Sequence, residues 1–449
     1  MSAIFKRGLP AIQVPHHKET AACHTVQMPD PPQVVIPMSQ HIGAICEPLV
    51  SVGQQVLVGQ CIGRSQAKVS ACIHASVSGT VTAIEDFVTT QGAISPAVTI
   101  ESDGKHTLDP GLTPPRVETV DDLYRAVYDS GLVGLGGAGF PSHIKVDPGN
   151  PNRIHTLIVN AAECEPFITS DYRAIIERSD DLMRGIRTVV QHLEIERCII
   201  GIEDNKPKAV DLLRQVLSHE ADGRIKLHVL PSRYPEGAEK VLIFKTTGVT
   251  VEEGRLPADY GLLVMNVSSL TFLGGYLRTG VPLVSKVVTV AGSAIADPQN
   301  VIAPLGAPYR SLIDFCGGYV GELGEVFMGG PMMGINIYDD SLPVLKNNNA
   351  IIAQSKADRI QMPESNCIRC GRCVAACPER LLPAMIDRAV YRNDIEALRH
   401  YKVNLCLECG CCAYVCPAKR QLVLSNRLGK RKLKEADMAK KAKEGQNGK

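Results

Sequence analysis

Cysteine is the residue type with the most chemical potential in this 449-residue chain, because eight of its 16 cysteines fall into two matching runs. Each run has three cysteines at intervals of three, then a fourth four residues later, followed directly by proline. Three thiolates at this spacing can bind one cubane cluster, while the fourth points toward a second cluster. The sequence therefore predicts two [4Fe-4S] clusters. Their ligands are Cys367, Cys370, Cys373 and Cys377 in the first run and Cys406, Cys409, Cys412 and Cys416 in the second.

The two runs are expected to exchange their fourth ligands. One cluster would take Cys416 with the first three cysteines of the first run, and the other would take Cys377 with the first three of the second. The alternatives are a zinc site and a disulfide framework. Zinc sites use paired Cys-x-x-Cys units with four ligands in all and no terminal Cys-Pro, so two complete runs disfavour zinc. Cys411 lies outside the pattern and is expected to be a bystander.

A second candidate site begins with the glycine-rich residues 131–141, which read Gly-Leu-Val-Gly-Leu-Gly-Gly-Ala-Gly-Phe-Pro. Glycine lets the backbone approach a ligand closely and turn its N–H groups toward phosphate oxygens. Lys145, a few residues downstream, could add a positive charge. The alternative is a structural turn, because the run lies between a predicted helix and a predicted strand rather than opening a helix after a strand, as dinucleotide-binding loops do. The run favours a nucleotide of some kind.

An acidic segment strengthens that interpretation. The predicted strand 156–160 ends at Asn160 and leads directly into Ala-Ala-Glu-Cys-Glu-Pro, which contains Glu163 and Glu165. Open α/β sheets bind their ligands at the carboxyl ends of the strands. An amide and two carboxylates are therefore expected at a ligand-binding edge.

The surrounding pattern predicts several modules. Short Val-, Ile- and Gly-rich runs up to about residue 110 are typical of an all-β unit that resembles lipoyl carrier domains, with Lys68 near the lipoyl-lysine position but without its usual flanks. Alternating helices and strands over 119–230 predict a mostly parallel α/β sheet, whose first helix opens with a Thr119–Asp122 capping box. Residues 281–331 predict a β-grasp module with one helix at 309–315. Residues 340–362 are expected to be a connection, and helix is expected between the cysteine runs, over 381–399.

Charge and composition exclude several classes of protein. The net charge of +1 gives no indication of a nucleic-acid partner. No run of about 18 apolar residues is present, so no membrane span is expected, and 16 cysteines without a secretory signal indicate a reducing compartment. Residues 427–449 carry nine basic and three acidic side chains. This basic tail is expected to be a solvated helix or disordered, or else a contact for an acidic partner or anionic lipid.

Several motifs together resemble a known family. The glycine run, Lys145 and the segment from Asn160 to Pro166 resemble the FMN and NADH site of the flavoprotein subunit of respiratory complex I. The whole arrangement is closer to the C subunits of Rnf complexes, which join a barrel-like domain, a flavin domain, a β-grasp domain and two ferredoxin motifs in that order. Four further segments resemble that family: residues 16–20, 201–207, 234–240 and 328–334.

The resemblance implies roles for individual residues. The flavin phosphate would be bound by Gly134, Gly136, Gly137, Ala138, Gly139 and Lys145. The isoalloxazine and nicotinamide side would be lined by Asn160, Glu163, Glu165 and Asn266. Some positions depart from complex I: Val133 and Leu135 replace arginines and Ala162 replaces an aspartate, which affects the nicotinamide contacts most.

The family implies an electron-transfer subunit of a membrane-bound, cation-translocating complex. It would pass electrons between NAD(H), FMN and two [4Fe-4S] clusters, toward or from ferredoxin. It would bind the other Rnf subunits as a peripheral protein at the cytoplasmic face of the cell membrane. The alternatives are a cobalamin reductase of microcompartments, whose glycine loop lies near the N-terminus, and a cluster-bearing adaptor that binds no nucleotide.

The expected fold is multidomain, α/β and β. Its parts are an N-terminal lipoyl-like barrel-sandwich (1–112), an FMN- and NADH-binding α/β domain (116–275), a β-grasp (SLBB) domain (281–335), an α-helical double-ferredoxin domain (358–426) and the basic tail (427–449).

Overall fold

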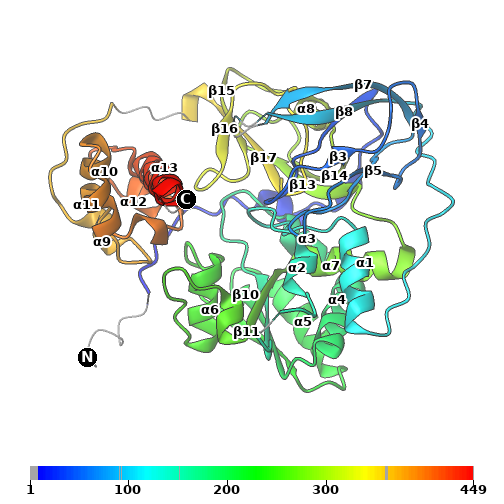
Figure 1. Ribbon diagram of the computed structural model, residues 1–449, viewed down its shortest axis with the longest axis horizontal. Helices are drawn as coiled ribbons and strands as arrows, with labels where there is room; N and C mark the ends of the chain where they lie inside the picture. The colour runs from blue at the N-terminus through cyan, green and yellow to red at the C-terminus, as the bar shows by residue number, and fades with distance from the viewer. Residues whose placement is uncertain (1–8, 90–91, 93, 151, 359–362, 448–449) are drawn as a thin grey trace. The chain divides into compact units, whose positions relative to one another are not determined.

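The structure is a computed structural model that describes residues 9–89, 92, 94–150, 152–358 and 363–447. The first eight residues of the predicted barrel domain, residues 359–362 of the predicted ferredoxin domain and the last two residues of the predicted tail lie outside this range. The chain divides into two compact units (Figure 1). The larger comprises His16–Pro231 and Leu256–Arg359, and the smaller comprises Met1–Pro15, Ser232–Arg255 and Ile360–Lys449.

The N-terminal part of the larger unit is the predicted all-β module. Its strands form one sheet in the order β2-β8-β7-β4 and another in the order β3-β5-β6. Alternate Val and Ile side chains point inward from β2, β7 and β8, as the two-residue period of a strand requires, and form a separate buried core. The strands are β2 (Gln33–Pro37), β3 (Glu47–Pro48), β4 (Gln55–Val56), β5 (Cys61–Arg64), β6 (Ile73–His74), β7 (Gly79–Val88) and β8 (Ile94–Ser102).

The middle of the larger unit is the predicted parallel α/β fold. Its sheet has the order β11-β10-β9-β12, and every neighbouring pair is parallel. The strands are β9 (Thr156–Ala161), β10 (Arg197–Glu203), β11 (Ile225–Leu230) and β12 (Leu262–Asn266). The helices are α1 (Val120–Asp129), α2 (Ser142–Lys145), α3 (Ser170–Glu177), α4 (Ser179–His192), α5 (Pro207–Ser218) and α7 (Val267–Thr279).

Local sequence explains how these helices begin and pack. The predicted capping box of α1 is present: the Thr119 hydroxyl accepts from Asp122 N–H, and the Asp122 carboxylate accepts from Thr119 N–H. The single helix expected from residue 173 to 192 is instead two, α3 and α4, because Arg178 leaves helical geometry. Helices α4 and α7 pack closely (Figure 1). A Cβ at Gly274 of α7 would lie 1.8 Å from the Asp181 carbonyl oxygen, so this crossing requires glycine.

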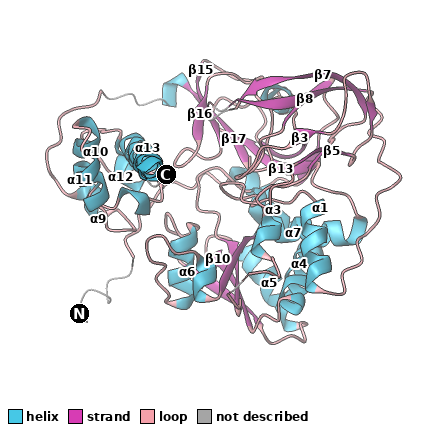
Figure 2. Ribbon diagram, viewed as in Figure 1, coloured by secondary structure: helices cyan, strands magenta, loops and turns pink. Residues whose placement is uncertain are grey.

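The third part of the larger unit is a six-stranded sheet with the order β1-β14-β13-β17-β15-β16, drawn as magenta arrows in Figure 2. The helix expected at 309–315 is α8 (Tyr309–Phe315). The connection expected over 340–362 is wrong, because β17 (Ala350–Ser355) lies there and pairs with both β13 and β15. Its Ala-Ile-Ile-Ala run is fully buried. The other strands are β1 (Thr25–Gln27), β13 (Ser285–Ala291), β14 (Gln299–Pro304), β15 (Leu323–Met328) and β16 (Ile335–Ile337).

The smaller unit holds both cysteine runs and is helical, as expected. It also contains residues 232–255 with α6 (Glu239–Thr247), which the sequence pattern assigned to the α/β domain. The Tyr234 hydroxyl donates to the Cys409 carbonyl oxygen at 2.6 Å and so joins this segment to the second run. The remaining helices are α9 (Arg372–Ala375), α10 (Pro383–Tyr391), α11 (Ile395–His400), α12 (Cys411–Tyr414) and α13 (Leu422–Asn447).

Helix α13 passes through residue 427 without a break, so the predicted basic tail begins inside a helix of the cluster-bearing unit. Leu433 is buried in that unit's core, and Arg427 and Lys430 both pair with Glu408 of the second run, at 2.9 and 2.8 Å. Among the described residues, no helix has both the length and the apolar character needed to cross a bilayer.

Candidate functional site

The glycine run forms a loop between α1 and α2, here called the glycine loop (residues 131–141). Its middle is exposed at Gly136, Gly137 and Ala138, whereas Leu135 is buried and its N–H donates to Ser269 Oγ at 3.1 Å. A Cβ at Gly136 would lie 2.5 Å from Asn266 Nδ2, so only glycine lets the loop approach Asn266 this closely. At Gly137 a Cβ would meet no atom within 4 Å. The loop therefore offers an open backbone face to a ligand.

Both ends of the glycine loop are fixed by backbone hydrogen bonds. Gly134 is half-buried, and its N–H donates to the Phe140 carbonyl oxygen at 2.9 Å. Gly139 is buried, and its carbonyl oxygen accepts from Ile42 N–H of the barrel at 3.2 Å. The barrel thus contacts the loop beside its exposed middle.

A second loop, here called the acidic loop (residues 160–168), follows β9. Its Glu163 carboxylate accepts from Asp171 N–H at 2.8 Å and Tyr172 N–H at 3.3 Å, in the first turn of α3. This is the favourable position for an anion at a helix N-terminus. Burial nevertheless raises the pKa of Glu163 to about 7. The side chain of Glu163 is therefore held by α3 and orients the loop.

Two lysines from distant segments bind the acidic loop through its carbonyl groups. Lys18 Nζ donates to the carbonyl oxygens of Glu163, Glu165 and Ile168 at 2.9, 2.7 and 2.5 Å. Lys206 Nζ donates to the Glu203 carboxylate at 2.5 Å and lies 3.4 Å from the Glu163 carbonyl oxygen. Sequence reasoning gave neither lysine a role, although both belong to the family-like segments 16–20 and 201–207. The resemblance of these two segments to the family was the only indication in the sequence that the lysines contribute to the site.

Glu165 points to a different neighbour. Its Oε2 accepts from Met332 N–H at 3.1 Å, and a Cβ on Gly330 would lie 2.1 Å from that same oxygen. The family-like segment 328–334 thus packs directly on the acidic loop. Glycine at 330 is required because the carboxylate occupies the space that a side chain would need.

The two predicted asparagines lie on adjacent strands at the carboxyl edge of the sheet, where Asn266 and Asn160 are paired in register. Asn266 caps α7 by accepting from Ser268 N–H at 2.9 Å, and its amide donates to Asp171 Oδ2 at 2.8 Å. The Asn160 side chain accepts from Ala162 N–H at 3.2 Å. The structure therefore brings both asparagines together with the two loops.

Lys145 lies on α2, and its ammonium donates to the Val264 carbonyl oxygen of β12 at 2.8 Å. It is half-buried and close to the strand that ends at Asn266. Its predicted contact with a phosphate remains a prediction.

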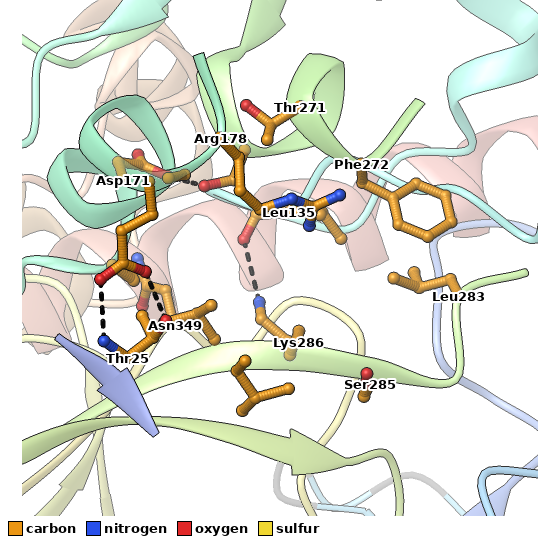
Figure 3. A pocket seen from close by; sticks show the side chains of 16 residues that line it. Thr25, Leu135, Asp171, Arg178, Thr271, Phe272, Leu283, Ser285, Lys286 and Asn349 are labelled. Carbon is orange, nitrogen blue, oxygen red and sulfur yellow. Dashed lines mark hydrogen bonds between the residues drawn. The ribbon is translucent and has the colours of Figure 1, made fainter. Parts of the chain in front are cut away.

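A cavity of about 110 Å³ lies behind the glycine loop. Figure 3 shows Lys286 reaching from β13 to the Leu135 carbonyl oxygen, with Asp171 and Arg178 across the cavity. Asp171 accepts from Ser268 Oγ at 2.5 Å, and burial raises its pKa. The cavity wall is mostly apolar, and Asp171, Arg178 and Lys286 are the charged groups among the residues labelled in Figure 3.

In the smaller unit, the four cysteines of the first predicted cluster lie around one cavity. Cys367, Cys370 and Cys373 of the first run and Cys416 of the second line one cavity of about 270 Å³. A cavity shared by four thiols, one contributed by the other run, fits a cubane cluster with an exchanged ligand.

The second group joins Cys377 to the second run. The pKa of Cys377 is raised to about 11, mainly by burial and in part by the nearby thiols of Cys409 and Cys406. Cys406 Sγ accepts from Glu408 N–H at 3.4 Å and Asn426 Nδ2 at 3.2 Å. Hydrogen bonds of this kind to cluster sulfurs tune the reduction potential.

The two runs also repeat one backbone conformation. Arg369 and Glu408 occupy matching positions and both have φ of 57°, and Gly371 and Gly410 follow with φ of 75° and 82°. Burial differs between the runs: Cys367 and Cys370 are exposed, whereas Cys409 and Cys412 are buried. Cys411, the expected bystander, is buried at the start of α12.

Comparison with known families matches four segments in the expected order. Residues 4–105 match the RnfC barrel sandwich hybrid domain, 127–273 the Nuo51 FMN-binding domain, 287–336 the SLBB domain and 359–417 a 4Fe-4S dicluster domain. These matches confirm the expected fold class and the expected FMN and iron–sulfur cofactors. The barrel precedes the flavin domain, which is the order expected for Rnf rather than for the microcompartment reductases.

Among solved structures, the chain is similar to an NAD+-reducing [NiFe]-hydrogenase in the H2-reduced state, with a TM-score of 0.50 and 19% identity. The likeness covers 70% of this chain and 61% of the hydrogenase chain. At this identity it supports the fold alone.

Curated relatives match at higher identity. The C subunit of the Na(+)-translocating ferredoxin:NAD(+) oxidoreductase complex of Acetobacterium woodii is 39% identical, over 96% of this chain and 97% of the relative. The C subunit of the proton-translocating ferredoxin:NAD(+) oxidoreductase complex of Clostridium ljungdahlii is also 39% identical, over 80% and 79%. The C subunit of the ion-translocating oxidoreductase complex of Rhodobacter capsulatus is 36% identical, over 85% and 74%. With this identity along nearly its whole length, the chain belongs to the family of Rnf complex C subunits.

Proposed function

We propose that this subunit transfers electrons between NAD(H) and the other subunits of an ion-translocating complex, by way of FMN and two [4Fe-4S] clusters. The observation that carries the proposal is that one chain joins an FMN-binding domain of complex-I type to a dicluster domain. NADH yields an electron pair as hydride and a [4Fe-4S] cluster accepts one electron, and bound FMN supplies the conversion between them. The names of the relatives, ferredoxin:NAD(+) oxidoreductase subunits, agree with this exchange.

In this proposal the chain's own residues bind and orient the cofactors. The open backbone face of the glycine loop binds the flavin phosphate, because peptide N–H groups are suited to anions. Glu163 and Glu165 position the acidic loop through the contacts they make with α3 and with Met332, so neither is needed as a proton donor or acceptor. The phosphate side comprises Gly134, Gly136, Gly137, Ala138, Gly139 and Lys145, and the ring side comprises Asn160, Glu163, Glu165 and Asn266.

Each cluster is assigned three ligands from one run and one from the other. Cys367, Cys370, Cys373 and Cys416 share one cavity, which supports the first set. The second set is Cys406, Cys409, Cys412 and Cys377, and the first two and Cys377 lie close enough to Cys412 for their charges to raise the pKa of its thiol.

The partners are assigned from the family. Other subunits would move the cation and exchange electrons with ferredoxin, while this subunit binds them peripherally at the cytoplasmic face of the membrane. Helix α13 is a candidate contact, because Arg431 is 78% exposed at the side chain and further exposed lysines follow it.

The test is anaerobic purification of the full chain, followed by flavin extraction, iron quantification and rapid mixing with NADH. We expect FMN and two clusters per chain, with flavin bleaching before cluster reduction. Intact protein with full iron and no FMN would refute the flavin assignment. Bound FMN that NADH does not reduce would refute the assignment of the electron donor.

A substitution in the first run tests the order of the electron path. Cys370→Ala should remove one cluster signal from the EPR spectrum and leave NADH-dependent flavin reduction near the wild-type rate. Cys23→Ala, a half-buried thiol outside both runs, serves as the control. If flavin reduction is lost together with the cluster signal, the cluster-bearing and flavin sites do not function separately.

A further inference from the structure

Two buried lysines lie behind the glycine loop and bind its carbonyl groups. Lys286 Nζ of β13 donates to the Leu135 carbonyl oxygen at 3.4 Å, as Figure 3 shows, and to the Lys346 carbonyl oxygen at 3.0 Å. Lys346 Nζ donates to the carbonyl oxygens of Gly131 at 2.7 Å and of Cys72 at 2.5 Å. Together they connect the loop to the barrel on one side and to the six-stranded sheet on the other.

Both ammonium groups are removed from water. The exposed fraction is 0% for Lys346 and 9% for Lys286. Burial lowers the pKa of Lys346 to about 8 and that of Lys286 to about 7. Lysine is rarely buried to this extent without a paired carboxylate, because removing its charge from water costs several kcal/mol.

Neither lysine forms an ion pair with a carboxylate among the described residues. The thiols of Cys72, Cys46 and Cys61 favour the charged form of Lys346, and its charge also acts on the imidazoles of His41 and His74. Lys286 is influenced by Asp171, whose two oxygens already accept from Asn266 and Ser268. The positive charge behind the loop is therefore only partly compensated within this part of the chain.

The opposite side of the loop is where an anion could complete the site. Gly136, Gly137 and Ala138 are exposed there, and Gly137 has open space beyond it. Because the lysines bind the loop from behind through Gly131 and Leu135, the exposed glycines remain accessible to a ligand. A phosphate on that face would be attracted by both ammonium groups through a region of low dielectric constant.

We propose that Lys286 and Lys346 are positioning residues of the flavin-phosphate site: they hold the glycine loop through its carbonyl groups, and their charge makes the loop select a phosphorylated flavin over riboflavin. This proposal rests on the proposed FMN assignment of the loop. It adds the residues that determine which form of the flavin is bound.

The test uses the full chain, purified anaerobically with its clusters and depleted of flavin, and titrated with FMN and with riboflavin by fluorescence. Lys346→Gln and Lys286→Gln retain an N–H donor for the carbonyl groups but remove the charge. We expect FMN to bind about tenfold more weakly to each variant, because one positive charge no longer attracts the phosphate through the protein, with riboflavin changed by less than about twofold. Lys356→Met, an exposed lysine at the end of β17, should change neither affinity.

The outcomes separate the two proposals. If wild-type protein with full iron binds no FMN, the FMN assignment itself is wrong. Suppose that it binds FMN. If the Gln variants then weaken the binding of FMN and of riboflavin equally, or weaken the binding of neither, the selection of phosphate by these lysines is refuted. Lys346→Met and Lys286→Met also remove the hydrogen-bond donor. In these variants the ratio of FMN affinity to riboflavin affinity should fall to the same extent as in the Gln variants.

Discussion

The glycine loop and the acidic loop are held in the same way but differ in charge. A pair of lysines binds backbone carbonyl groups of each: the buried Lys286 and Lys346 behind the glycine loop, and the half-buried Lys18 and buried Lys206 behind the acidic loop. Lys206 is paired with the Glu203 carboxylate at 2.5 Å, and the Glu163 carboxylate acts on Lys18. Behind the glycine loop, the Asp171 carboxylate acts on Lys286, whereas only thiols raise the pKa of Lys346, and neither lysine forms an ion pair among the described residues.

This difference matches the two ends of the proposed ligand. The isoalloxazine ring carries no fixed charge, so the loop proposed to line it can be neutral within the protein. The phosphate is anionic, so the loop proposed to bind it benefits from charge that the protein leaves uncompensated. Lysines that bind the carbonyl groups of a loop can therefore support either a neutral ring or an anionic phosphate, depending on whether a carboxylate compensates their charge.

Removal of a lysine that has a carboxylate partner should have the largest effect. Lys18→Met would leave three carbonyl groups without their donor and the Glu163 carboxylate buried without its cation. We expect a loss of about 3–5 kcal/mol in the free energy of unfolding, because three carbonyl groups lose their donor and a buried carboxylate loses a nearby cation. Urea unfolding at constant salt measures it, with Lys208→Met, an exposed lysine on α5, as the control.

Lys346→Met sharpens the comparison in the same assay. It removes a buried charge that no carboxylate neutralises, so the cost should be limited to lost hydrogen bonds, about 1–3 kcal/mol. Equal losses for Lys18→Met and Lys346→Met would contradict the difference in compensation between the two loops.

Two substitutions in the glycine loop should distinguish effects on the free energy of unfolding from effects on FMN affinity. In Gly136→Ala the new Cβ would displace the Asn266 side chain and weaken its cap on α7, at a cost of about 1 kcal/mol, and FMN affinity should fall about tenfold. In Gly137→Ala no protein atom is displaced, so stability should stay within about 0.5 kcal/mol while FMN affinity still falls. Thermal unfolding and fluorescence titration provide the two measurements.

Gly223→Ala is the control for both, because its Cβ would also meet no atom within 4 Å and it lies in a turn before β11, outside both loops. Unchanged FMN affinity in Gly137→Ala would place the phosphate elsewhere than on the exposed face of the glycine loop.

The sequence predicted the parts of this arrangement whose signals are local or strictly periodic. The spacing of Cys367 to Cys416 was sufficient to predict that Cys416 joins the first run, and the alternation of β9, α4 and β10 was sufficient for the parallel sheet. The family resemblance also grouped Asn160 with Asn266, and the structure pairs these two residues in register on β9 and β12.

The supporting lysines could not be predicted in this way. Lys18, Lys286 and Lys346 are far from the loops in sequence, and an isolated lysine is normally expected at the surface. The expected connection over 340–362 likewise hid β17, because a short apolar run at the end of a module resembles a linker until its partner strands are known. Both failures concern long-range contacts that depend on the assembled sheet.

The smallest expected effect is on the pH dependence of the free energy of unfolding, which has opposite signs for the contributions of the two loops. Burial raises the pKa of Glu163 from 4.5 to about 7, so the folded state binds this proton more tightly than the unfolded state. Its contribution to stability is complete below pH 4.5 and is lost as the pH rises through 7. The lowered pKa values of Lys286 and Lys346 have the opposite consequence: stability should increase with pH between about 7 and 10.5.

Glu163→Gln isolates the acidic-loop contribution, because glutamine can still accept from the N–H groups of α3 but cannot titrate. Between pH 5 and 7 the unfolding free energy of the wild type should decline by an amount on the order of 1 kcal/mol, and that of the variant should not show this decline. Glu196→Gln, an exposed carboxylate paired with Arg153, should follow the wild-type curve. If the curves of unfolding free energy against pH are parallel for wild type and Glu163→Gln, the buried carboxylate keeps an ordinary pKa. Lys18 would then compensate the charge of Glu163 enough to cancel the effect of burial.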